Sequence, residues 1–126
     1  MHYTQIPADL LAVLRQGTVI PAMPLALNSK REFQALRQRA LARYYIDAGA
    51  GGIAVGVHST QFEIRDPAIN LFEKVLRTVS EAIDEWSQKS GRWILKIAGV
   101  CGRADQALYE ADFAVQHGYH AGLLSL

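Results

Sequence analysis

The chain has 126 residues, of which 50% are hydrophobic and 20% are charged, a composition typical of one folded domain rather than of a disordered chain. Its 13 basic and 12 acidic residues give a formal net charge of +1, so nothing points to nucleic acid or an anionic membrane as a partner. The single cysteine, Cys101, excludes an internal disulfide and suits a reducing compartment. No stretch approaches the roughly 20 apolar residues of a membrane helix, and the N-terminus lacks a secretory signal. We therefore predict a soluble, cytoplasmic protein.

Short apolar runs alternate with longer amphipathic ones. A leading helix is expected over 7–16, ended by Gly17. The expected strands are 18–23, 52–57, 93–100 and 120–126, and the expected helices between them are 33–49, 66–87 and 102–116. Two helix starts have sequence signals: Ser29 and Glu32 fit a capping box, and Asp66 followed by Pro67 fits an N-cap.

Strands separated by helices run parallel with right-handed crossovers, so the sequence predicts an α/β fold. Two architectures satisfy this pattern: the N-terminal half of a (β/α)8 barrel over residues 1–126, or a flavodoxin-like doubly wound sheet. With strands in sequential order, all helices lie on one face, and the other face would be a bare apolar sheet. Monomers seldom expose so large an apolar surface. The barrel interpretation therefore implies that the missing half of the barrel, or a second copy in a homo-oligomer, covers it.

Four segments resemble, in order and spacing, the first four strands of the dihydrodipicolinate synthase / N-acetylneuraminate lyase family. Residues 48–62, AGAGGIAVGVHSTQF, resemble the family's second strand, which usually reads GVDGIxVxGTTGE. Residues 17–25, 96–100 and 117–124, which read GTVIPAMPL, KIAGV and HGYHAGLL, resemble the first, third and fourth strands with their flanks.

The resemblance implies a barrel with class I aldolase or lyase chemistry on pyruvate or a related 2-oxo acid, with no metal and no cofactor. In such enzymes a lysine forms a Schiff base with the keto carbon, and a hydroxyl pair after the second strand relays protons beside the substrate carboxylate. The family lysine belongs to the sixth strand and is absent from this chain. The hydroxyl pair aligns with His58-Ser59, or with Ser59-Thr60 if one residue is inserted. The family glutamate becomes Gln61 or Glu63.

The candidate site follows the second expected strand, because ligands of parallel α/β folds bind at the carboxyl ends of strands. We assign catalytic roles to His58 and Ser59 and substrate binding to Ser59 and Thr60. The competing interpretation is that these hydroxyls only satisfy loop backbone groups. Lys96, in an apolar strand, is a candidate nucleophile, but the stronger expectation is that it pairs with a carboxylate or extends to an end of the barrel.

Two further functions stay open at this stage. One is a complete flavodoxin-like domain that binds a small ligand or regulates without catalysis. The other is an inactive scaffold that assembles through its open sheet face. Strand order separates the barrel from the doubly wound sheet.

Overall fold

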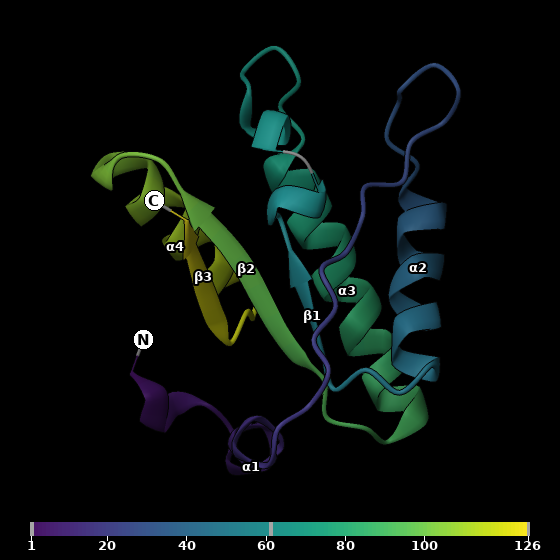
Figure 1. The fold of residues 1–126 in the computed structure, drawn as a ribbon, viewed down its shortest axis with the longest axis vertical. Coiled ribbons are helices and arrows are strands. Elements are labelled where there is room, and N and C mark those ends of the chain that lie inside the picture. The colour runs from purple at the N-terminus through teal and green to yellow at the C-terminus, as the bar shows by residue number, and fades with distance from the viewer. Residues whose placement is uncertain (1, 61, 126) are drawn as a thin grey trace.

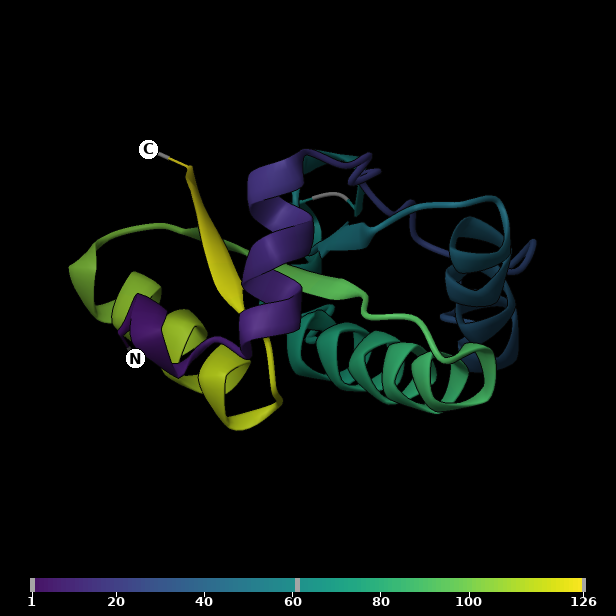
Figure 2. The ribbon, with the colours of Figure 1, turned by 90° about the horizontal axis from the view of Figure 1, so that it is seen from below.

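A parallel three-stranded sheet organises the chain. The computed structural model describes residues 2–60 and 62–125. The strands β1 (Gly52–Val55), β2 (Leu95–Cys101) and β3 (Ala121–Ser125) lie side by side in the order β1-β2-β3. The helices α2 (Ala35–Asp47), α3 (Phe72–Ser90) and α4 (Ala104–Gln116) alternate with them along the chain. Figure 1 shows the strands running in one direction, and Figure 2 shows the three helices following one side of the sheet as an arc.

The first expected strand is present only as an extended segment beside β1. Ala54 donates its amide to the Pro21 carbonyl at 3.0 Å, and Met23 donates to the Ala54 carbonyl at 2.9 Å. The ladder is reduced to the bridge between Ala22 and Ala54, because Pro21 has no amide hydrogen with which to continue it. The prediction of a full strand over 18–23 is thus wrong, because only one bridge forms. The segment nevertheless lies where the first strand was expected.

The sequential order excludes the doubly wound alternative. In a flavodoxin-like sheet the spatial order of the strands reverses after the first strand, and helices cover both faces. Here the order is 18–23, β1, β2, β3, with α2, α3 and α4 on one side (Figure 2). The chain therefore folds as a partial (β/α)8-type barrel.

Helix α1 (Ala8–Gln16) precedes the sheet, as expected from the sequence. Gly17 ends it with φ = 84°, a backbone angle that glycine adopts without strain. The helix lies near the ends at which the strands begin, on the side of the sheet away from α3 (Figures 1 and 2).

The core lies between the sheet and the helical arc. Alternate residues of β1 and β2 face the helices, and Ile53, Val55 and Ala98 are fully buried there. Helix α3 supplies the longest apolar stripe, with four of its buried side chains, Val75, Leu76, Val79 and Ile83, in this cluster. The helical periodicity of this stretch thus predicted the packing face.

Two helices begin later than their sequence signals predict. Asn28, rather than Ser29, organises the turn before α2, because its Oδ1 accepts from the amides of Lys30 and Glu32 at 2.9 and 2.8 Å. Asp66 Oδ1 accepts from the Ala68 amide at 2.8 Å in a separate turn, and α3 starts only at Phe72. Short polar side chains satisfy turn amides as readily as helical ones, so neither signal fixed the helix start.

Strand β3 has an exposed surface, in contrast to its neighbours. All four residues of β1 are buried, whereas every residue of β3 is exposed. Leu123 and Leu124 are 55% and 60% exposed. The end strand of this sheet therefore presents apolar side chains and an unpaired backbone edge to solvent.

Lys96 points into the helical layer. It is paired with Ile53 across β1 and β2, and its Nζ lies 2.7 Å from Asp84 Oδ1 and 3.0 Å from Ser80 Oγ of α3. The expectation of a lysine that pairs with a carboxylate is confirmed.

The substitution Asp84→Ala is expected to lower the free energy of unfolding by about 1–3 kcal/mol, because the buried Lys96 ammonium then loses its carboxylate and keeps its hydrogen bond to Ser80 Oγ. Lys96→Met is expected to cost less, since it removes the buried charge together with its need for a partner. Urea denaturation measures both. The matched control is Glu81→Ala on the same helix, with a carboxylate that is 62% exposed and an expected loss under about 0.5 kcal/mol. Equal losses for Asp84→Ala and Glu81→Ala would contradict the assignment.

Candidate functional site

A cavity of about 200 Å³ lies where the strands end. His58 and Phe62 come from the loop after β1, and Ser125 is the last residue of β3. The full lining is Val57, His58, Phe62, Gly99, Val100, Leu123 and Ser125. An imidazole and a hydroxyl thus share an otherwise apolar cavity at the carboxyl ends of the strands, the usual ligand position in this fold class.

Two glycines allow the loop after β1 to cross the sheet closely. Gly56 has φ = 74°, in the left-handed region that favours glycine. A Cβ at Gly99 of β2 would lie 2.4 Å from the Gly56 carbonyl oxygen. The backbone at Gly56 therefore contacts the backbone of β2, and the chain turns there toward His58.

The three predicted site residues form one short 3-10 turn, His58–Thr60. His58 lines the cavity with an exposed side chain, whereas Ser59 is exposed beside it and does not line it. Thr60 is fully buried, and its Oγ1 donates to the Met23 carbonyl at 2.6 Å. The Thr60 hydroxyl therefore ties the turn to the first extended segment. Gln61 lies outside the described residues, and Glu63 is exposed.

Arg65 holds this loop against the sheet and α4. Its Nε lies 2.8 Å from Glu110 Oε1, and its Nη2 donates to the Gly99 carbonyl at 3.1 Å. Both side chains of the ion pair are buried, with 8% and 2% exposure. Its guanidinium carbon lies 4.6 Å and 5.7 Å from the ring centroids of Phe72 and Phe62, within cation–π range. The cation thus orients an aromatic residue of the cavity wall.

Glu110 distributes its two oxygens over three elements. Oε1 accepts from Arg65 and from Gln106 Nε2 at 2.8 Å, and Oε2 accepts from the Cys101 amide at 3.1 Å. Burial raises the pKa of the Cys101 thiol, the neighbouring Glu110 charge adds to that effect, and Arg65 opposes it. The thiol at the end of β2 is therefore held in its neutral, weakly nucleophilic form.

Sequence reasoning did not find Phe62, Ser125 or Arg65 as site residues. The available signal for Ser125 was its place at the end of the fourth predicted strand, the same argument that selected His58. No comparable signal marked Arg65, because its partners Glu110 and Gly99 are 45 and 34 residues away along the chain.

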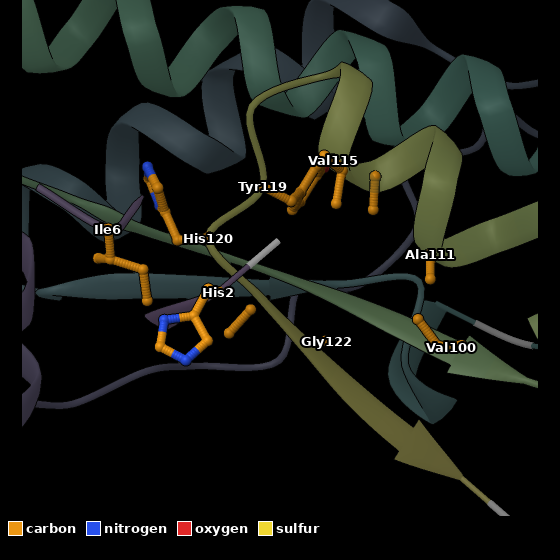
Figure 3. Close-up of a pocket in the computed structure, with 10 residues that line it drawn as sticks. His2, Ile6, Val100, Ala111, Val115, Tyr119, His120 and Gly122 are labelled. Carbon is orange, nitrogen blue, oxygen red and sulfur yellow. The ribbon is translucent and has the colours of Figure 1, made fainter. Parts of the chain in front are cut away.

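A second cavity, of about 420 Å³, lies in the outer layer beside the beginning of β3. Figure 3 shows His2 and Ile6 of the N-terminal segment on one side and Ala111 and Val115 of α4 on another. Each strand of a complete (β/α)8 barrel is followed by a helix of the outer ring, and this cavity lies on the helix-facing side of β3. We therefore place the candidate site in the smaller cavity at the carboxyl ends of the strands.

His120 borders this second cavity and is half-buried. Its Nδ1 accepts from the Lys96 amide at 2.9 Å. Burial lowers the pKa of the imidazole below its usual value of 6.5, and the Lys96 charge lowers it further while Asp84 opposes both. Protonation of Nδ1 would also remove the acceptor that the Lys96 amide uses.

In the described ranges, 2–60 and 62–125, no group of three histidine, cysteine or carboxylate residues is arranged to hold a metal ion. The same ranges contain no helix of the length and hydropathy that crossing a bilayer requires.

Solved structures show which fold class this arrangement resembles. A putative dihydrodipicolinate synthetase from Pseudomonas aeruginosa superposes with a TM-score of 0.69 at 16% identity, over 83% of this chain and 33% of that one. A rubisco-like protein from Burkholderia fungorum superposes with a TM-score of 0.63 at 17% identity, over 94% of this chain and 28% of that one. The chain thus spans about a third of the length of these barrel proteins and shares their fold. No protein-family model and no curated protein sequence matches it.

Glu110→Ala is expected to lower the free energy of unfolding by about 3–5 kcal/mol, because it leaves the buried Arg65 cation without its carboxylate. The double variant Arg65→Met/Glu110→Leu is expected to lose less, since no buried charge remains. Gln106→Ala removes one hydrogen bond from the exposed side of the same network and serves as the control, with a loss of about 1 kcal/mol. Chemical denaturation measures all three. A double variant no more stable than Glu110→Ala would contradict the ion-pair account.

Stability is expected to fall as the pH drops below about 6.5, the usual pKa of histidine. The unfolded chain binds a proton at His120 before the folded chain does, so acidification through that value favours unfolding. His120→Gln should remove this part of the pH dependence, whereas His58→Gln, at an exposed position, should retain it. Thermal unfolding between pH 8 and pH 5 measures the difference. Parallel pH profiles for the wild type and His120→Gln would exclude His120 as the cause.

Proposed function

We propose that this chain supplies the N-terminal strands and a ligand-binding loop of a class I aldolase or lyase that acts on pyruvate or a related 2-oxo acid. The observation that carries the proposal is the cavity at the carboxyl ends of β1, β2 and β3, where His58 and Ser125 are the polar side chains of the lining. The fold shared with the Pseudomonas protein supports the same class.

Each loop residue has a separate role in this proposal. His58 transfers a proton near neutral pH and contacts the substrate from the cavity wall. Ser59, exposed beside it, donates its hydroxyl to the substrate carboxylate and assists the proton relay. Thr60 contributes to substrate binding indirectly: its hydroxyl donates to the Met23 carbonyl and so holds the loop that contacts the substrate. Ser125 adds a second hydroxyl from the opposite edge of the cavity.

The Schiff-base lysine comes from outside this chain. Lys96 lies on β2, but its ammonium faces α3 and is bound by Asp84 and Ser80. A lysine that attacks a keto carbon needs a neutral amine that reaches the substrate. The lysine therefore belongs to later strands of the complete barrel, which functions in the cytoplasm.

Titration of the ¹⁵N-labelled chain with pyruvate is expected to shift the amide resonances of His58, Ser59 and Ser125 at millimolar ligand. Ser125→Ala and His58→Ala should each weaken binding several-fold, because each removes a polar contact worth about 1 kcal/mol. Ser90→Ala, at the exposed end of α3, is the matched control and should bind as the wild type does.

Borohydride reduction in the presence of pyruvate is expected to give no covalent adduct, because the reactive lysine is absent. An adduct at Lys96 would contradict this assignment. Equal shifts with acetate would show that the cavity recognises a carboxylate rather than a 2-oxo acid, and no shift with pyruvate would overturn the proposed ligand.

A further inference from the structure

The arc of strands has two open edges, one at each end. The segment 18–23 is bonded to β1 on one side, and β3 is bonded to β2 on one side. Apolar side chains are exposed at both edges: Val19 is 71% exposed, and Leu123 and Leu124 are 55% and 60% exposed.

The free edge of β3 can be assigned from its backbone pairing. The Leu95 amide donates to the Gly51 carbonyl, so the backbone groups of the odd-numbered residues of β2 face β1 and those of the even-numbered residues face β3. The pairing of Ala98 with Gly122 then directs the groups of Ala121, Leu123 and Ser125 to β2, and the groups of Gly122 and Leu124 face outward.

The free edge of the first segment follows from the same rule. The Gly51 amide donates to the Val19 carbonyl at 3.1 Å, and the Ala54 amide donates to the Pro21 carbonyl. The groups of Thr18, Ile20 and Ala22 therefore face outward, and the missing amide of Pro21 falls on the side of β1. Both free edges carry unpaired donors and acceptors.

Neither edge carries the features by which natural sheets block further pairing. Proteins protect edge strands with charged side chains, with proline or with a covering element. The outward residues at both edges are uncharged and are not proline: Thr18, Ile20, Ala22, Gly122 and Leu124. A net charge of +1 for the whole chain adds no appreciable repulsion between copies.

We propose that two copies of this chain pair edge to edge, β3 of each beside segment 18–23 of the other, and so close an eight-stranded parallel barrel. Each copy contributes the three strands of the sheet and the extended first segment, which is half of the strands that a (β/α)8 barrel contains. A two-fold axis along the barrel keeps all strands parallel and uses the same contact twice.

The pairing also accounts for the uncovered side of the sheet. Ala54, Ile97 and Ala121 are in register, and so are Gly99 and Leu123, so these side chains face away from the helices. In the closed pair they enter the interior beside the equivalent residues of the second copy, and the cavity of His58 and Ser125 gains an opposite wall. This closure takes the place of the later strands invoked above: it keeps the cavity but brings no lysine other than those of this chain. Sedimentation therefore tests the assembly, and borohydride reduction tests the Schiff-base assignment separately.

Sedimentation velocity of the purified chain tests the pairing. The expected result is a species of twice the 13.9 kDa chain mass at micromolar concentration. Leu124→Pro removes an outward amide and leaves the bonds to β2 in place, so it should give a folded monomer. Leu123→Lys places a charge on a side chain that enters the interior of the closed pair and should weaken the dimer at least tenfold.

Leu36→Lys is the matched control, because Leu36 is 83% exposed on α2, away from both edges, and it should remain a dimer. Circular dichroism confirms that each variant is folded, and Leu123→Lys decides the question if Leu124→Pro does not fold. A wild-type monomer at all concentrations would overturn the proposal and leave closure to other polypeptide. A dimer that survives both the Leu124→Pro and the Leu123→Lys substitutions, or open-ended aggregates, would overturn it as well.

Discussion

Each strand of a parallel sheet has two edges whose backbone groups need hydrogen-bond partners, and this need governs the whole molecule. Strand β2 is paired along both edges, with β1 and β3, and β1 is paired with β2 and with the segment 18–23. Strand β3 is bonded on one side and exposed throughout. Because all three crossover helices pack on one side, the other side of the sheet carries only α1, near the ends at which the strands begin (Figures 1 and 2). The open edge and this largely uncovered side are therefore two consequences of one sequential strand order.

The same geometry concentrates polar groups at one end of the sheet. Parallel strands deliver their carboxyl ends to a single edge, which is how His58 and Ser125 come to share a cavity although 67 residues separate them in the sequence. The loop that bears His58 is held by the buried pair of Arg65 and Glu110 and by the Thr60 hydroxyl. A site built on such fixed contacts keeps its shape before a ligand arrives, which favours binding.

Local pattern predicted the elements, whereas contacts between distant residues set their limits. The apolar stripe of α3 and the helix end at Gly17 were readable because each depends on neighbours in sequence. The helix starts were not: Asn28 and Asp66 satisfy turn amides, and which amide a short side chain serves depends on the tertiary path. The site divides in the same way. His58 followed from its place after a strand, but the assignment of Arg65 required Glu110, far along the chain.

The orientation of Lys96 follows from the register of the strands. Residues paired across parallel strands project to the same side, so the pairing of Lys96 with the buried Ile53 directs its ammonium to α3. One residue earlier or later on β2 would have directed a lysine to the opposite side. Because side chains alternate between the two sides of a strand, a shift of one position decides whether a lysine enters the helical layer or the opposite side. Hydrophobicity alone does not reveal which side a residue faces, because it is high across the whole of 93–100. Here the neighbours Asp84 and Ser80 complete the assignment, because they give the buried charge acceptors within hydrogen-bond distance.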